Sequence, residues 1–357
     1  MPLVRPNRTI RSAVSVLAGL VFVFAGALQP VNADDALSIA GGSTTAGLFD
    51  VLEIVADEAG FYKEAHLDVT KQYAGGASTA AQLVASGKVD LCVISVEPAL
   101  VGYEKGVRLQ FFLSRQSQYS YVLGVLNDSP IRKLEDLKGK EIGEVTAGSL
   151  SEVAADSMLE GAGLSREDYS FVPIGYGAQG LQAVLDKRVA ATIDIYASLI
   201  TDEVAAGTKF RIFHNPLLND IANVGYGALP STIAAKSDVL RRFSRAIVKA
   251  AVFVRADPQA AARLYLKGSH QTITPAELAT RTHLLTLLEP ELPAADPANR
   301  RIGYLSPRGL ELYSRSLVDA GFAHQVVPGS AIATDRFIDY ANDFDRRAVE
   351  RLAKSFH

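Results

Sequence analysis

The stretch Gln82-Leu-Val-Ala-Ser-Gly-Lys-Val89 returns 100 residues later in a related form, Gln182-Ala-Val-Leu-Asp-Lys-Arg-Val189. Each copy comes after a short strand-like run and a loop of small residues, and each predicts the end of a helix. This shared order of strand, loop and helix strengthens a match that would be weak by itself. The repeat therefore predicts two lobes of related architecture.

In the first half of the chain, short apolar runs alternate with amphipathic segments. Leu48, Leu52 and Val55 fall on one face of a helix that stops at Ala59-Gly60. Strand-loop-helix units that follow one another in this way predict a parallel sheet with right-handed crossovers. The expected strands are 37–40, 66–73 and 89–94, and the expected helices between them are 48–60 and 79–86.

Two extended segments without a helical period, 113–126 and 223–229, are the candidate hinge strands. From Lys236 onward the pattern is mostly helical, and these helices are expected to return and cover the first lobe. The expected return helices are 239–255, 275–288, 307–320 and 335–355. The expected division is a leader at 1–33, a first lobe at 34–122, a second lobe at 123–227, and a return to the first lobe with C-terminal helices at 228–357.

The leader has the three parts of a secretory signal peptide. Three arginines, the last of them Arg11, precede an apolar run at 13–28, and Val31-Asn-Ala33 provides small residues for cleavage before Asp34. The alternative is an uncleaved anchor, but the run is shorter than the roughly 20 residues that a spanning helix needs. Cleavage would take the formal net charge from -3 to -6 and would place the protein in a bacterial periplasm.

The composition excludes several classes of protein. Of 357 residues, 48% are hydrophobic and 21% charged, which argues against a disordered chain. The net charge of -3 and the absence of a long basic run argue against a nucleic-acid binder. Cys92 is the only cysteine, so neither an internal disulfide nor a cysteine-rich metal site is expected. We expect no metal and no cofactor.

Six short signatures occur in a consistent order between about residues 37 and 320, and together they resemble the type 2 periplasmic solute-binding proteins of ABC importers. The nearest branch is that of the nitrate, sulfonate and taurine binders and the thiamine-pyrimidine-precursor binders. The signatures are Glu58-Ala-Gly-Phe-Tyr-Lys63, Leu67-Asp-Val69, Gly87-Lys-Val-Asp-Leu91, Leu134-Glu-Asp-Leu-Lys-Gly-Lys-Glu-Ile142, Glu160-Gly-Ala-Gly-Leu164 and Gly303-Tyr-Leu-Ser-Pro307.

The resemblance implies an α/β fold with two lobes, each a mostly parallel sheet flanked by helices, with the C-terminal helices on the first lobe. It implies a monomeric receptor, not an enzyme, that closes on a small organic anion, a sulfonate or carboxylate with a possible aromatic body, and docks on a membrane permease. The alternatives are a binder of a neutral pyrimidine thiamine precursor and a synthase-like enzyme on the same fold. One departure is Lys187-Arg-Val-Ala190, where the family's second lobe usually has Gly-x-Val-Asp; we interpret it as a change of scaffold away from the cleft.

Ligands of open parallel sheets bind outside the carboxyl ends of the strands, where helices begin with unpaired N–H groups that favour anions. Hydroxyls in these loops could add donors, although Ser and Thr at such places are most often ordinary N-caps. Aromatic side chains there would suit a flat or apolar ligand. The candidate ligand-binding residues are Ser43, Thr44, Thr45, Phe49, Gly76, Ser78, Ser95, Glu97, Arg115, Thr146, Ser149, Tyr176, Asp194, Tyr196 and Tyr226.

Arg115 follows a predicted strand near the crossover between the lobes, where a guanidinium could hold a carboxylate or sulfonate with two parallel hydrogen bonds. The alternative is a solvated surface arginine. Glu97 and Asp194 would instead suit an amine or a ring N–H, so the charge of the ligand stays open.

Catalytic patterns are weak. Gly175-Tyr-Gly-Ala-Gln-Gly180 matches the dinucleotide-binding spacing, but the helix after it is short and an exported protein has little access to NAD(P). The six histidines are scattered without metal-ligand spacing. Cys92 falls within an apolar strand, which predicts a buried and unreactive thiol.

Overall fold

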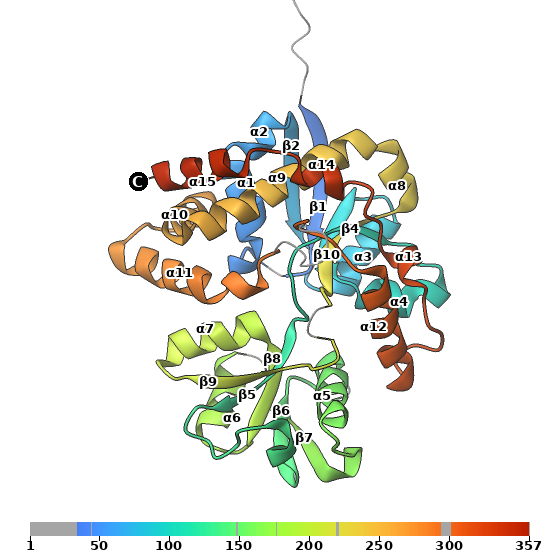
Figure 1. The fold of residues 1–357 in the computed structure, drawn as a ribbon, viewed down its shortest axis with the longest axis vertical. Helices are drawn as coiled ribbons and strands as arrows, with labels where there is room; N and C mark the ends of the chain where they lie inside the picture. The colour runs from blue at the N-terminus through green and yellow to red at the C-terminus, as the bar shows by residue number, and fades with distance from the viewer. Residues whose placement is uncertain are drawn as a thin grey trace, which may run out of the picture. The chain divides into compact units, whose positions relative to one another are not determined.

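The computed structural model describes residues 34–43, 45–147, 149–175, 177–218, 221–293 and 301–356 (Figure 1). Residues 34–357 form one compact unit. The expected leader at 1–33 lies outside the described residues.

The chain forms two five-stranded sheets (Figure 1). The strand order is β2-β1-β3-β10-β4 in the first sheet and β7-β6-β8-β5-β9 in the second. The first sheet contains β1 (Asp35–Gly41), β2 (Leu67–Tyr73), β3 (Leu91–Ser95), β4 (Gln110–Ser114) and β10 (Val224–Ala228). The second contains β5 (Tyr121–Leu126), β6 (Lys140–Glu144), β7 (Tyr169–Pro173), β8 (Ala191–Ile195) and β9 (Phe210–His214).

Both sheets are mixed in the same way. In the first, β1 is parallel to β2 and β3, whereas β10 is antiparallel to β3 and β4. In the second, β6 is parallel to β7 and β8, whereas β5 is antiparallel to β8 and β9. The predicted α/β fold with two related lobes is confirmed, and each sheet includes one antiparallel strand next to its parallel core.

The lobe boundaries differ from the expected ones by a few residues. The chain leaves the first sheet after Ser114 and enters the second at Tyr121, then leaves it after His214 and re-enters the first sheet at Val224. The expected division at 227/228 therefore assigned β10 to the wrong lobe. By its sequence the segment 223–229 is a candidate hinge strand, but a Cβ at Gly225 would lie 2.7 Å from the Leu113 carbonyl oxygen. Gly225 serves close packing inside a sheet.

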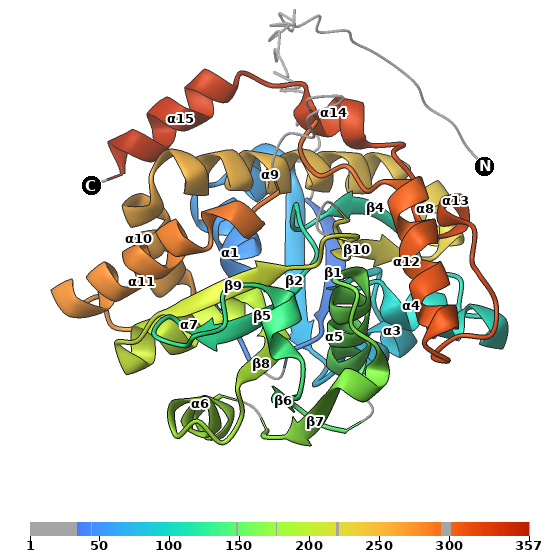
Figure 2. The same ribbon diagram turned by 60° about the horizontal axis from the view of Figure 1, so that its bottom comes forward.

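Helices cover both sheets and then return to the first (Figures 1 and 2). The first lobe has α1 (Val51–Glu58), α2 (Phe61–Glu64), α3 (Ala77–Ala85) and α4 (Glu97–Gly102), and the second has α5 (Leu150–Gly161), α6 (Ala178–Leu185) and α7 (Tyr196–Ala206). The return comprises α8 (Pro230–Ala235), α9 (Ser237–Ala256), α10 (Pro258–Gly268), α11 (Pro275–Leu287), α12 (Pro307–Asp319), α13 (Gly329–Ile332), α14 (Ile338–Asn342) and α15 (Arg346–Ser355).

The return helices pack on the first lobe as expected. α9 and α10 contact α1, and α14 and α15 lie on the outer side of α9 (Figure 2). The single helix expected at 335–355 is wrong: it is divided into α14 and α15, because the Asp345 carboxylate accepts the Ala348 N–H and starts a new helix there. The helix α10 was not expected, since its many alanines give no clear apolar period.

The repeat is exact in its backbone hydrogen bonds. Gly87 donates to the Val84 carbonyl at 2.9 Å, and Lys187 donates to the Val184 carbonyl at 3.0 Å. Gly87 has a φ of +70° and Lys187 a φ of +55°, so both residues occupy the left-handed region. A side chain with a Cβ is strained there, whereas glycine is not. The turn is the same in both lobes, but only the first uses the residue that suits it.

We expect Lys187→Gly to have a higher free energy of unfolding than Lys187→Ala, by about 1 kcal/mol. Both variants lose the lysine side chain, so the difference reports the left-handed backbone alone. Chemical denaturation of the two variants measures it. Equal stability would show that Lys187 is not strained.

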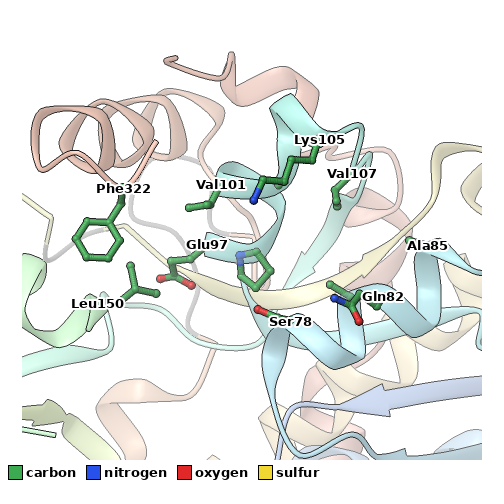
Figure 3. Close-up of a pocket in the computed structure, with 12 residues that line it drawn as sticks. Ser78, Gln82, Ala85, Glu97, Val101, Lys105, Val107, Leu150 and Phe322 are labelled. Atoms are coloured by element: carbon green, nitrogen blue, oxygen red, sulfur yellow. The ribbon is translucent and has the colours of Figure 1, made fainter. Parts of the chain in front are cut away.

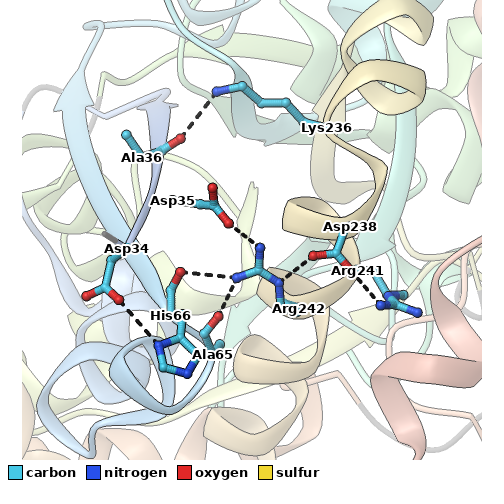
Figure 4. Close-up of polar contacts among 9 residues, drawn as sticks. All are labelled: Asp34, Asp35, Ala36, Ala65, His66, Lys236, Asp238, Arg241 and Arg242. Carbon is cyan, nitrogen blue, oxygen red and sulfur yellow. Dashed lines mark hydrogen bonds and ion pairs between the residues drawn. The ribbon is translucent and has the colours of Figure 1, made fainter. Parts of the chain in front are cut away.

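The start of β1 is held to the return segment by Arg242 on α9 (Figure 4). Its guanidinium donates to the Asp35 carboxylate, to the Asp238 carboxylate at 2.8 Å, and to the main-chain carbonyls of Ala65 and His66. The side chain is only 17% exposed. One side chain therefore joins β1, the turn before β2, and α9.

Arg242→Met should lower the free energy of unfolding by about 2 kcal/mol, because several charged and main-chain acceptors lose their donor together. Arg241→Met is the matched control: Arg241 is 45% exposed and bonds only Asp238 among the acids. It should cost less than about 1 kcal/mol. Urea unfolding of both variants tests this, and equal losses would contradict the role of Arg242.

Candidate functional site

The loops after the parallel strands carry most of the predicted ligand-binding residues. Four of these residues, Ser43, Thr45, Ser78 and Thr146, have exposed side chains. Gly76 precedes α3, and Ser95 is a half-buried residue at the end of β3. Thr44 and Tyr176 lie outside the described residues.

Ser149 is the N-cap residue of α5, but its hydroxyl does not cap the helix. It lies 2.7 Å from the Ser151 hydroxyl instead. The helices α3 and α6 begin after Gly76 and Gly177, which have no side chain for capping. The alternative that the loop hydroxyls serve as ordinary N-caps is therefore wrong for Ser149, and the first N–H groups of α5 have no side-chain acceptor from their N-cap residue.

Arg115 follows β4 and is buried, with 6% of its surface exposed. Its guanidinium carbon lies 3.8 Å from the centre of the Phe49 ring, and Phe49 is itself 38% exposed. The Arg115 Nε has no hydrogen-bond partner. The alternative of a solvated surface arginine is wrong: Phe49 covers a buried cation whose Nε donor is not used.

Acidic side chains lie beside this cation. Glu53 is buried, and the Tyr226 hydroxyl donates to its Oε1 at 2.9 Å, while Lys71 lies 3.5 Å from the same oxygen. Burial would raise the pKa of Glu53, but the charges of Lys71 and Arg115 outweigh it and hold the pKa below its usual value. Lys71 also donates to Asp50. The group contains two acids and two cations, so its charges balance.

Tyr226 has no exposed surface. It lies on β10 within the first core, with its ring 5.2 Å from that of Phe243. Its hydroxyl group holds the Glu53 carboxylate by a hydrogen bond from within the core, and its side chain does not face solvent.

Glu97 begins α4 and is 2% exposed. Its Oε1 accepts hydrogen bonds from Asn223 at 3.0 Å and from the Tyr313 hydroxyl at 2.6 Å, whereas its Oε2 has no partner. It lines a pocket of about 370 Å³ together with Ser78 and Leu150, and Figure 3 shows its carboxylate directed toward Leu150. The pocket therefore combines residues of both lobes around one incompletely bonded carboxylate.

Asn223 connects this carboxylate to both crossovers between the sheets. It is fully buried, and its Oδ1 accepts from Gln116 Nε2 at 3.0 Å and from the Ser120 N–H at 3.1 Å. Sequence reasoning missed Asn223, Gln116 and Tyr313, because an isolated polar residue beside a strand gives no signal of its partners.

In the second lobe, Asp194 is buried and accepts hydrogen bonds from the Ile195 N–H and the Ser198 hydroxyl. Burial raises its pKa to about 6. The Tyr196 hydroxyl donates to the Leu287 carbonyl of α11 at 3.1 Å, so the second lobe contacts the return helices here. These two candidates are on or next to β8, and the structure does not bring them against Arg115 or Glu97 through any hydrogen bond among the described residues.

The dinucleotide-like glycines have a packing role. A Cβ at Gly180 would lie 2.6 Å from the Gly175 carbonyl oxygen, so Gly180 is needed for the close approach of α6 to its loop. The cavity at this place is about 10 Å³, too small for a nucleotide.

Cys92 is fully buried, and burial raises the pKa of its thiol to about 12. Among the described residues, no three His, Cys, Asp or Glu side chains are grouped to hold a metal ion. In the same part of the chain, none of the helices has the length and apolar character needed to cross a membrane.

Glu144, at the end of β6, was not among the predicted residues. It is 2% exposed, and burial together with the charge and hydrogen bond of Glu152 raises its pKa to about 7. Between its ordinary pKa of 4.5 and this value, the folded protein holds a proton that the unfolded chain releases. The free energy of unfolding therefore falls as the pH rises through this window.

Glu144→Gln should raise the free energy of unfolding by about 1–3 kcal/mol at pH 8, with the gain disappearing toward pH 4.5. Denaturation of the wild type and the variant across this range measures the difference. Glu141→Gln is the control, because Glu141 is an exposed acid on the same strand. It shows the effect on stability of removing a negative charge that is not buried. A gain independent of pH would contradict the shared proton.

Comparison with known proteins gives both a family and a fold. A model of the NMT1/THI5-like family matches residues 51–261. The periplasmic aliphatic sulphonate binding protein SsuA from Escherichia coli has a similar structure, with a TM-score of 0.65 and 14% identity, covering 83% of this chain and 96% of that chain. This likeness identifies a periplasmic-binding-protein-like fold.

The relatives of known name are similar to this chain over only part of their length. A Haemophilus influenzae protein named for thiamine biosynthesis is 29% identical over 153 residues, 43% of this chain and 48% of that protein. The 4-amino-5-hydroxymethyl-2-methylpyrimidine phosphate synthase THI11 of Saccharomyces cerevisiae is 24% identical over 225 residues, 59% of this chain and 65% of the enzyme. The chain spans about half to two thirds of the length of these relatives.

Proposed function

The chain belongs to the NMT1/THI5-like family, and from this premise we propose that it is a periplasmic solute-binding protein of an ABC importer. It captures a small organic anion, a sulfonate or carboxylate, between two lobes and delivers it to a membrane permease. The proposal includes a cleaved leader at 1–33 and a monomeric receptor without catalytic activity.

Arg115 is the observation that carries this proposal. A buried guanidinium with an unbonded Nε is unfavourable unless something else uses its donors, since buried polar groups are normally hydrogen-bonded. A carboxylate or sulfonate accepts two parallel hydrogen bonds from such a group. Phe49 lies against the guanidinium face and would contact the body of a flat ligand.

The position of Arg115 suits a receptor that closes. It follows β4 directly, at the start of the first crossover, and its N–H donates to the Val224 carbonyl on the strand that completes the second crossover. A ligand held at the crossovers can contact both lobes and so favour the closed state, by as much as its affinity for the two states differs.

A second candidate function rests on Glu97. Its free Oε2 would accept an N–H from a neutral pyrimidine precursor of thiamine, and the curated relatives include a pyrimidine phosphate synthase. A binder of that precursor and a synthase-like enzyme are both alternatives on this fold. Turnover of a candidate would favour the enzyme, and tight stoichiometric binding without turnover would favour the receptor.

A thermal-shift screen of sulfonates, carboxylates, nitrate and pyrimidines identifies the ligand, because a bound molecule raises the melting temperature by mass action. For an acid found in this way, Arg115→Gln should weaken binding about 100-fold, as expected when charged hydrogen bonds are lost. The same variant should also melt lower, because Glu53 loses a neighbouring cation. Calorimetric titration below the melting range measures the affinity.

Arg108→Gln, an exposed arginine, is the control and should bind as the wild type does. Unchanged affinity of Arg115→Gln for the acid would refute the clamp. A pyrimidine whose affinity is lost in Glu97→Gln and kept in Arg115→Gln would support the second candidate.

A further inference from the structure

We propose that the second lobe has a further binding site, for a small organic anion with an apolar body, at the amino ends of its parallel strands. A pocket of about 670 Å³ lies there, bordered by the starts of β6 and β7, the loop after β5, and the turn between α6 and β8. Its size is that of a small-molecule site. It is at the opposite end of β6 and β8 from Thr146 and Asp194, so it is separate from the site proposed above.

The floor of the pocket is apolar and fixed. Ile131, Val184 and Val189 line it, and each is buried. Arg211 holds the adjoining loop, because its guanidinium donates to the Ile131 carbonyl at 2.7 Å and to the Asn127 carbonyl at 3.0 Å. The pocket is therefore formed before any ligand arrives.

The internal repeat shows how the two lobes differ at this pocket. Asp90 of the first lobe donates its N–H to the Ser38 carbonyl at 3.1 Å, and Ala190 of the second lobe donates in the same way to the Glu141 carbonyl at 2.8 Å. The two residues occupy equivalent positions. The Asp90 carboxylate is bonded to the Ser38 N–H and hydroxyl, both at 2.9 Å, whereas Ala190 has no such group and lines the pocket.

Cations line the pocket next to this position. Lys187 pairs with Asp128 at 3.9 Å, but the side chains of Lys140 and Arg188 have no ion pair or hydrogen bond with any described residue. Glu141 is the unpaired acid among the described lining residues. Two unpaired cations and one unpaired acid leave an excess of positive charge, and a guanidinium beside an apolar floor suits a carboxylate or sulfonate on an apolar body.

Lys187 supplies a second observation. It keeps a left-handed φ of +55° where the first lobe has glycine, and a residue with a Cβ is strained in this conformation. Strained backbone positions persist most often at functional sites. The second copy of the repeat therefore differs from the first twice within four residues. Ala190 stands where the first lobe has Asp90, and the strained cation Lys187 stands where it has Gly87.

The probe for this site is 8-anilino-1-naphthalenesulfonate, a sulfonate with an aromatic body whose fluorescence rises in apolar surroundings. Titration is carried out in the Arg115→Gln background, so that the site between the lobes contributes as little as possible. In that background, Ala190→Asp restores the carboxylate of the first lobe and should weaken binding about tenfold or more. Arg188→Gln should weaken it by about threefold to tenfold, for the loss of one charged contact.

Lys88→Gln is the matched control, because Lys88 is the repeat equivalent of Arg188 and is also exposed. It should leave the affinity unchanged. The proposal is overturned if the probe does not bind saturably, or if Ala190→Asp and Arg188→Gln bind it as tightly as the control. If Ala190→Asp does not fold, Arg188→Gln decides alone. Since this pocket shares no residue with Arg115, failure here leaves the proposed receptor function untouched.

Discussion

The side chain of Asn223 is the constraint on which the arrangement of the two lobes depends. The chain passes between the sheets twice, and both passages must be held in one geometry although neither is part of a sheet. The Asn223 side-chain oxygen accepts hydrogen bonds from Gln116 and Ser120 of the first crossover. Asn223 itself is the last residue of the second crossover, so it joins the two. Its side-chain NH2 group donates to the Glu97 carboxylate, which also accepts from the Tyr313 hydroxyl of the return segment. A fully buried amide without these partners would be costly, so the network favours this one arrangement of the two crossovers.

Each sheet contains one antiparallel strand, placed where a crossover ends. β5 and β10 are the strands that the chain forms immediately after each crossover, and each is inserted between two strands of its sheet. Each crossover therefore leads into a strand in the interior of a sheet, and this strand is hydrogen-bonded to a neighbouring strand on each side. The chain passes between the sheets at residues 115–120 and again between His214 and Val224, and Gln116, Ser120 and Asn223 make buried polar contacts there. The lobes also contact each other away from the crossovers, through Tyr196 and Leu287.

The general fold could be predicted from sequence, because alternating strands and helices, an internal repeat and small-residue loops are local patterns. The boundaries at β10 and at α14 and α15 could not, since Gly225 is required by the nearby Leu113 carbonyl and the second helix starts through the Asp345 cap. Arg115 was recognised as a candidate from its place after a strand, but its burial under Phe49 depends on a segment 66 residues earlier. Glu144 gave no signal, because its raised pKa arises from its burial in the fold and from Glu152, which the fold places beside it.

Cys92 has a practical consequence. It is the single thiol of the chain, it has no exposed surface, and a pKa near 12 keeps it protonated in any ordinary buffer. Reagents that require a thiolate will therefore leave the folded protein unmodified. A cysteine introduced on the surface of each lobe would be labelled without background, so the distance between a pair of dyes could report opening and closing in the otherwise native sequence.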